Sequence, residues 1–194
     1  MRLAQSGVAV LCGQNTWTLL DDHVPAPRHL ERDAALSEIA RRYLTARGPA
    51  TDRDLAWWTG LTLTDARAAI ASVDDEFERL EVDGVVYRHA PGLEGAPDGI
   101  HLLPGFDEYL LGYTDRSAQL AGHPLTDVVP GGNGMFLATI VVNGEIAGTW
   151  RRTVRAKGVE LHAEPWGALS ATARRGFVNA ARAYADYLGV PLVS

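Results

Sequence analysis

The chain has 194 residues, a hydrophobic share of 46% and a net charge of −6, a composition that fits one large or two small globular domains and excludes a disordered chain. A single cysteine, Cys12, excludes an internal disulfide and a cysteine-based zinc site. No apolar run approaches the roughly 18 residues that a membrane span needs, and no signal segment opens the chain. A cytoplasmic protein without membrane contact is therefore expected.

The negative charge is concentrated in the first half of the chain. Residues 1–97 hold 10 Arg against 15 Asp and Glu, whereas residues 98–194 hold 8 Arg and Lys against 9 Asp and Glu. Phosphate contacts need local cations rather than a positive chain. A nucleic-acid partner would therefore have to be bound by clustered arginines.

Residues 1–30 have the pattern of a short β segment. The runs 7–12 and 16–20 are apolar and β-prone, and they predict a hairpin or two edge strands. Pro25 and Pro27 then break the chain. We predict that this segment is an N-terminal β element and linker continuing a preceding region.

Residues 31–92 predict a helix, a short helix, a third helix and a hairpin. Apolar spacing places the first helix over 32–47 and the third from Thr62 to about residue 73. The other boundaries are marked by Gly48-Pro49, Thr51, Gly60 and the turn Asp83-Gly84. This is the order of a winged helix-turn-helix domain, whose third helix enters a DNA major groove. Winged helices also serve as protein-interaction modules, and the acidic balance favours that alternative.

Residues 100–194 follow a Pro- and Gly-rich linker over 90–99 and predict a second, mainly antiparallel β domain. Strands are expected over 135–142, 145–150 and 159–162, the first two joined by the turn Asn143-Gly144. A long helix is expected over 170–188. The fold class is therefore α+β.

The most basic stretch of the chain runs from Trp150 to Lys157 and contains Arg151, Arg152 and Arg155. We expect it to form a turn after a strand, where it suits phosphate contact. A solvated β-turn is the equally weighted alternative. The patch could be extended by three arginines of the final helix, Arg174, Arg175 and Arg182.

Signals for catalysis are weak. The chain has no Gly-x-Ser-x-Gly elbow, no phosphate loop and no His-Glu-x-x-His helix, and its six histidines are scattered, so neither a metal nor a cofactor is expected. Residues 106–116 gather Asp107, Glu108, Asp115 and Arg116. Such a cluster can be a general-base pocket, but an ion-pair network that fixes a domain junction is the favoured interpretation.

Three stretches resemble the winged-helix family that includes the AlkZ-like DNA glycosylases. They are RYLTARGPATDRDLAWWTGLTLTDAR over 42–67, LPGFDEYLLGYTDRS over 103–117 and VNGEIAGTWR over 142–151. The resemblance implies tandem winged helices followed by a β-barrel-like domain. It also implies that alkylated bases are removed, or interstrand crosslinks unhooked, without a metal. The catalytic motif of the family is a Gln-x-Gln pair in the N-terminal part of its members.

This chain departs from the family at that motif. Gln5 and Gln14 are its only early glutamines, and they are too far apart in the sequence to form a Gln-x-Gln pair, while Gln119 is isolated. The resemblance is therefore to the C-terminal part of a family member, and no catalytic residue is transferred. The catalytic residues stay unknown, and a missing N-terminal winged-helix region is a possible partner.

We therefore predict a DNA-binding winged-helix protein that lacks glycosylase chemistry by itself. Its predicted DNA contacts are Thr62, Thr64, Arg67, Arg151, Arg152 and Arg155. Two alternatives stay open: an active glycosylase, alone or completed by a separate N-terminal half, and a non-catalytic protein-interaction module.

Overall fold

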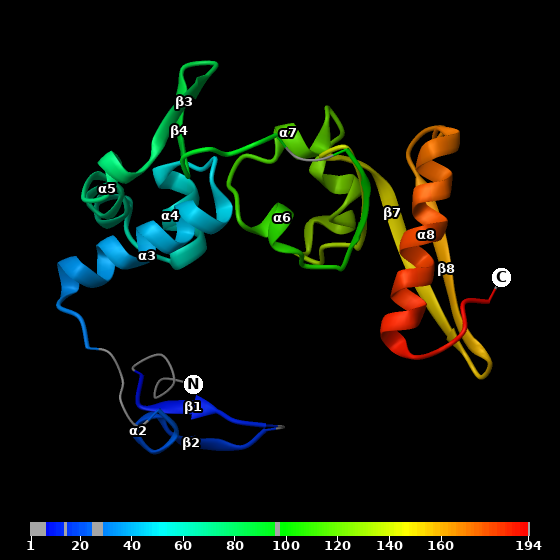
Figure 1. Cartoon of the computed structure of the whole chain (residues 1–194), viewed down its shortest axis with the longest axis horizontal. Helices are drawn as coiled ribbons and strands as arrows, with labels where there is room; N and C mark the ends of the chain where they lie inside the picture. The colour runs from blue at the N-terminus through cyan, green and yellow to red at the C-terminus, as the bar shows by residue number, and fades with distance from the viewer. Residues whose placement is uncertain (1–6, 14, 25–28, 96–97, 194) are drawn as a thin grey trace.

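The computed structural model of the chain describes residues 7–13, 15–24, 29–95 and 98–193. The N-terminal part is a small hairpin in which β1 (Ala9–Leu11) pairs antiparallel with β2 (Trp17–Leu19) and leads into the short helix α2 (Leu20–His23) (Figure 1). The predicted hairpin is confirmed. The predicted break at Pro25 and Pro27 lies outside the described residues.

Three helices and a second hairpin follow in the predicted order. The helices are α3 (Arg32–Arg47), α4 (Asp52–Thr59) and α5 (Leu63–Ala71), and a 3-10 turn, η1 (Asp74–Glu76), leads to the antiparallel strands β3 (Glu78–Val82) and β4 (Val85–His89).

The helix boundaries have local causes. Thr51 and Asp54 form a capping box at the start of α4, and Gly60 ends this helix in the left-handed conformation at φ 73°. Asp83 and Gly84 both have positive φ, as the tight turn of a two-residue hairpin requires.

The three helices bury a common apolar core. Its members come from all three helices and from the loops that flank them: Ala40, Tyr43, Leu44, Ala50, Leu55, Ala66, Ala69, Ile70, Val73 and Phe77. The partly buried side chain of Tyr113, from the second half of the chain, packs against the same core. The second half is therefore joined to the helices by apolar contact.

The second half contains a four-stranded antiparallel sheet. Its strands are β5 (Ile100–Leu103), β6 (Thr139–Val142), β7 (Glu145–Arg155) and β8 (Gly158–Pro165), in that spatial order. The last helix, α8 (Ala171–Leu188), contacts β5 and β8 (Figure 1).

Three details differ from the sequence-based expectation. The described residues form an open sheet with β5 and β8 at its edges, rather than a barrel-like closure. Strand β6 begins at Thr139 and not at residue 135. The reason is that the N–H of Leu137 donates a hydrogen bond to the carbonyl of Val128, which lies outside the sheet. Strand β7 continues to Arg155, since its pairing with β8 runs without interruption to Gly158.

The long connection between β5 and β6 fills the space beside the sheet. It contains the short helices α6 (Glu108–Leu111) and α7 (Ser117–Leu120) and the 3-10 turns η2 (Leu125–Asp127) and η3 (Pro130–Gly132). A second core joins it to the sheet through Leu110, Leu120, Val128, Val129, Val141 and Ile146. None of the helices in the described part of the chain is long and apolar enough to cross a membrane.

Candidate functional site

The predicted DNA contacts run from the N-cap residue Thr62 to the middle of α5. The Thr62 hydroxyl caps the helix by accepting a hydrogen bond from the Asp65 N–H at 3.1 Å, and it also donates to the Asp65 carboxylate at 2.9 Å. Thr64 and Arg67 are exposed and lie three residues apart, on one side of the helix. The structure therefore brings Thr64 and Arg67 together on the surface, while the Thr62 hydroxyl is already engaged in capping.

The charges of this surface are paired within the protein. Arg67 donates to the Asp52 carboxylate at 2.7 Å, although its side chain is 62% exposed. Arg32 pairs with Asp65 at 2.9 Å, and the hydrogen bonds from Arg32 and Thr62 hold the pKa of the Asp65 carboxyl below its usual value. DNA binding at α5 would have to exchange Asp52 for a phosphate.

The predicted basic turn is not a turn. Arg151, Arg152 and Arg155 all lie within strand β7, so the expectation of a turn was wrong. The reason is the long register with β8, in which Arg151 opposes His162 and Arg155 opposes Gly158.

Strand geometry separates the three arginines. Successive side chains point to opposite faces of a sheet, so Arg152 faces away from Arg151 and Arg155. Arg152 bonds the Tyr184 hydroxyl of α8 and lies over its ring. On the other face, Arg151 pairs with Glu164 at 2.6 Å and Arg155 with Glu160 at 3.0 Å. A continuous, uncompensated basic patch is therefore not formed.

The α5 and β7 clusters are also remote from each other. Figure 1 shows α5 and the β7–β8 end of the sheet at opposite ends of the longest axis. The six predicted contacts therefore belong to two separate surfaces.

The cluster of charges over residues 106–116 works as a structural junction. Asp107 accepts from the Tyr109 N–H at 2.8 Å and caps α6, and Asp115 accepts from the Ser117 N–H at 2.9 Å. Glu108 accepts from the Trp58 indole at 2.8 Å. These contacts favour a structural junction over a general-base pocket, but their donors are neutral. Among the described residues the cluster's one ion pair joins Glu108 to Arg47 at 3.3 Å, so the expected ion-pair network is not formed.

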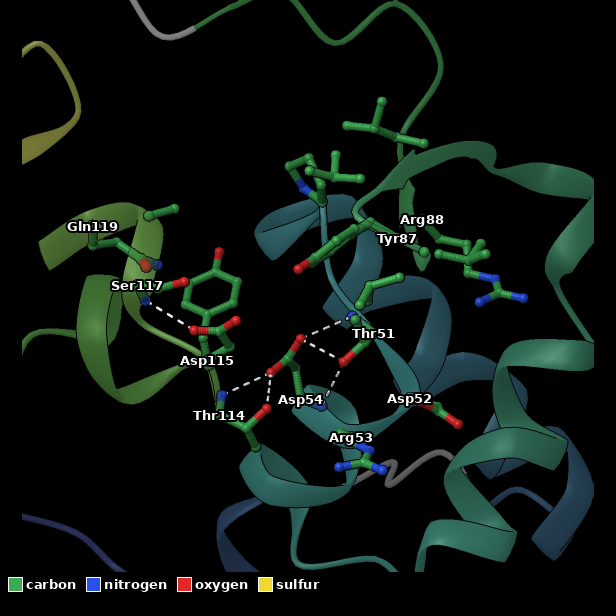
Figure 2. A pocket seen from close by; sticks show the side chains of 18 of the residues that line it. Thr51, Asp52, Arg53, Asp54, Tyr87, Arg88, Thr114, Asp115, Ser117 and Gln119 are labelled. Atoms are coloured by element: carbon green, nitrogen blue, oxygen red, sulfur yellow. Dashed lines mark hydrogen bonds between the residues drawn. The ribbon is translucent and has the colours of Figure 1, made fainter. Parts of the chain in front are cut away.

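The most buried carboxylate of the junction belongs to Asp54, which is 3% exposed. One of its oxygens accepts from the N–H and hydroxyl of Thr51 at 2.9 and 2.7 Å. The other accepts from the N–H and hydroxyl of Thr114, both at 2.7 Å. Four donors thus satisfy a charge that links the start of α4 to the second half of the chain (Figure 2).

Aromatic side chains complete the junction. Tyr43 donates to the carbonyl of Gly112 at 2.9 Å, and Trp57 donates to that of Leu111 at 2.9 Å. Tyr113 donates to the carbonyl of Arg47 at 2.8 Å. Burial raises the pKa of both the Tyr43 and the Tyr113 phenol.

Sequence reasoning did not identify these aromatic contacts. The available signal was the adjacent pair Trp57 and Trp58, two large apolar side chains on a helix of only eight residues. Both remain at least 40% exposed although their indole nitrogens are hydrogen-bonded.

A groove of about 1060 Å³ lies beside the junction. One wall is the β3–β4 hairpin, another is the segment from Thr51 to Asp54, and the third comprises α6, α7 and their connection (Figure 2). Gln119 lines the groove, and its amide nitrogen contacts the carbonyl of Tyr109 at 3.4 Å. Gln5 and Gln14 lie outside the described residues.

Two features limit the chemistry of the described residues. They contain no group of three or more His, Cys, Asp or Glu side chains that could hold a metal ion. Gln119 is the only glutamine among them, so a Gln-x-Gln pair is not present in the part of the chain that the structure covers.

Comparison with known proteins identifies the family. The family model for DNA glycosylase AlkZ-like proteins matches residues 1–187. An interstrand DNA cross-link repair glycosylase of Streptomyces sahachiroi is 32% identical over 129 residues, which are 62% of this chain and 35% of that protein.

The fold agrees with a solved structure. The DNA glycosylase AlkZ of Streptomyces sahachiroi has a TM-score of 0.75 and 23% sequence identity, over 95% of this chain and 53% of that one. This chain thus spans only part of the length of both relatives. Because the family model covers almost the whole sequence, the chain belongs to the AlkZ-like DNA glycosylase family.

Proposed function

We propose that this chain is a DNA-binding part of an AlkZ-like glycosylase, in which residues 31–92 form a winged helix-turn-helix domain. In this proposal α5 enters the major groove and the β3–β4 hairpin is the wing. Residues 100–194 form the second domain, and residues 1–30 continue a preceding region. The observation that carries the proposal is the match of the family model over residues 1–187.

The surface of α5 supports a close approach to DNA. Thr64, Arg67 and Ala68 are exposed, and two of these side chains are small. A hydroxyl and a guanidinium are suitable donors to phosphates and base edges. We therefore retain Thr62, Thr64 and Arg67 as the main proposed contacts.

Arg151, Arg152 and Arg155 form a second, weaker proposed contact surface. Arg151 and Arg155 are 62% and 59% exposed on one face of β7, but a glutamate neutralises each of them. Their contribution depends on exchange of these glutamates for phosphate.

For the chemistry, we propose that base excision needs groups that this chain does not carry. Gln-x-Gln is absent from its sequence, and Asp107, Glu108 and Asp115 are engaged in caps and junction contacts. The relative's name specifies an interstrand cross-link repair glycosylase. DNA with an alkylated or crosslinked base is accordingly the proposed ligand of this chain.

The test combines binding and cleavage. A fluorescent duplex containing one 7-methylguanine is titrated with the protein at low and high salt, and anisotropy is measured; the mixture is then treated with alkali. We expect binding that weakens as salt rises, without strand cleavage. Absence of salt-sensitive binding would reject the DNA-binding proposal, and cleavage would show that the chain is an active glycosylase.

The salt dependence of DNA affinity, measured in variants, tests the α5 contacts and the β7 contacts separately. Arg67→Ala is expected to reduce the slope of log affinity against log salt by about one unit. Arg151→Ala with Arg155→Ala tests the β7 surface in the same way, and Tyr187→Ala, at a side chain 85% exposed, is the control. An unchanged slope in Arg67→Ala would remove α5 from the DNA interface.

Protein interaction is the second candidate function, and the N-terminal hairpin favours it. Leu11, Trp17 and Leu19 are all more than 50% exposed, and the strand pairing places them on one face. Sedimentation of the wild type against Trp17→Ser tests this candidate. A concentration-dependent assembly that the variant abolishes would support it, and two identical monomer profiles would reject self-association.

A further inference from the structure

The groove beside the junction has an apolar wall that is open to solvent. In the β3–β4 hairpin, Leu80 pairs with Tyr87 and Val82 pairs with Val85, so these four side chains share one face. All four line the groove, and Leu80, Val82 and Val85 are 43%, 47% and 44% exposed. Such a wall offers one aromatic ring among aliphatic side chains to a ligand.

The opposite wall carries a carboxylate with no cationic partner. Asp115 accepts a hydrogen bond from the Ser117 N–H at 2.9 Å, and hydrogen bonding with Ser117 holds the pKa of the Asp115 carboxyl below its usual value. None of the ion pairs within 4.0 Å among the described residues involves Asp115. Figure 2 shows the Tyr87 ring extending from the hairpin toward Asp115 and Ser117.

The other charges around the groove leave it negative near Tyr87. Asp52 pairs with Arg67 at 2.7 Å. Arg88 pairs at 2.9 Å with Asp74, a carboxylate that it shares with Arg79, and Figure 2 shows the Arg88 guanidinium turned away from Asp115. Figure 2 shows the remaining lining cation, Arg53, with its guanidinium on the side of Asp54 away from Tyr87.

The Tyr87 phenol responds to this environment. Burial raises its pKa first, and the charges of Asp115, Asp54 and Asp83 raise it further, with no cation acting against them. The Asp115 carboxylate on the groove wall and the raised pKa of the phenol both favour a positive ligand over a phosphate.

We propose that this groove binds a planar aromatic cation, which stacks on Tyr87 between the apolar hairpin wall and the carboxylate of Asp115. Planarity suits the ring and the aliphatic side chains, and a delocalised positive charge suits both the ring face and the carboxylate. The volume of about 1060 Å³ is at the upper end of small-molecule sites. For an alkylated nucleoside this inference rests on the proposed function, whereas for an aromatic cation that is not a nucleotide it rests on the groove alone.

Two sources could supply such a ligand, an alkylated nucleoside or an aromatic cation that is not a nucleotide. The experiment therefore uses two matched pairs of probes: 1-methyladenosine against neutral adenosine, and proflavine against neutral acridine. Binding is measured by calorimetry for the nucleosides and by ligand fluorescence for the dyes, with the full chain. In at least one of the two pairs, we expect the cation to bind about threefold to tenfold more tightly than its neutral partner. The pair that shows this difference identifies the source of the ligand.

Two variants locate the binding. Tyr87→Leu removes the ring and keeps an apolar side chain, while Asp115→Asn removes the charge and keeps the oxygen that caps Ser117. Each is expected to weaken binding of the cation by about threefold to tenfold and to leave the neutral partner unchanged. Tyr187→Leu and Asp186→Asn, both on exposed residues of α8, are the matched controls.

Three results would overturn the inference. They are no saturable binding of either cation, equal binding of cation and neutral partner in both pairs, and equal loss in the groove variants and their controls. Asp115→Asn alone decides the location if Tyr87→Leu does not fold, and circular dichroism establishes folding for each variant.

Discussion

At the scale of single residues, Asp54 links α4 to the second half of the chain. Its buried carboxylate accepts four hydrogen bonds, two from Thr51 within the capping box and two from Thr114. Asp54→Ala leaves the donors of Thr114 without an acceptor and removes the reciprocal half of the cap. We expect the free energy of unfolding to fall by about 2–4 kcal/mol.

Chemical denaturation measures this loss. Asp75→Ala, at an exposed carboxylate of η1, is the matched control and should change the stability by less than about 0.5 kcal/mol. An equal effect of the two variants would contradict the role given to Asp54.

Tyr43 gives the molecule a dependence on alkaline pH. Its phenol is 1% exposed, and burial, followed by the charge of Asp54, raises its pKa. Because the folded pKa is above the unfolded value of about 10, the stabilisation is complete below that pH and is lost as pH rises through the folded pKa. Tyr43→Phe should therefore lose less stability than the wild type between about pH 9 and pH 11.

Urea unfolding across this pH range tests the prediction, with Tyr187→Phe as the control because that side chain is 85% exposed. The control should follow the wild type. A Tyr43→Phe variant that follows the wild type as well would remove Tyr43 as the cause.

At the scale of elements, α8 lies against β5 through a glycine. A Cβ built on Gly176 would lie 2.3 Å from Cγ1 of Ile100 and 3.0 Å from its Cβ. The helix propensity of alanine favours Gly176→Ala by about 1 kcal/mol, but the overlap forces α8 away from β5. We expect a net loss of about 1–3 kcal/mol in the free energy of unfolding.

A double-mutant cycle separates these effects. Ile100→Ala removes the overlapping atom, so it should make Gly176→Ala less costly in the double variant than in the single one. Gly167→Ala, where the added Cβ meets no atom within 4 Å, is the control. Additive effects at positions 176 and 100 would contradict the proposed overlap.

Sequence patterns predicted most elements well because their causes are local. The capping box of Thr51 and Asp54, the left-handed Gly60 and the positive φ angles at Asp83-Gly84 all act within a few residues. The end of β7 was missed because no local signal separates a basic turn from a basic strand. Its pairing with β8 decided the outcome.

At the scale of the whole molecule, charge pairing between elements controls the proposed DNA surface. Asp52, at the start of α4, holds Arg67 of α5 at 2.7 Å. Asp52→Asn removes a negative charge and frees the guanidinium for a phosphate. On the DNA-binding proposal we expect affinity for duplex DNA to rise by about threefold to tenfold at low salt.

Anisotropy measures this change, and Asp186→Asn removes the same charge from the other end of the molecule (Figure 1). The control should bind like the wild type. A rise of the same size in both variants would indicate a general charge effect, and no rise in either would contradict the role of Arg67.

The sequence by itself determined the positions of the hairpins and of the helices α3, α4, α5 and α8, and it indicated the family, because caps, turns and motifs depend on neighbouring residues. It did not predict the short helices α2, α6 and α7. The tertiary structure alone decided the open sheet, the separation of the α5 and β7 arginines, the pairing of their charges and the groove beside the junction. These features depend on contacts between distant residues, such as Tyr43 with Gly112 across 69 positions and Asp54 with Thr114 across 60. Local patterns carry no information on such pairs, because chain folding and packing alone bring them together.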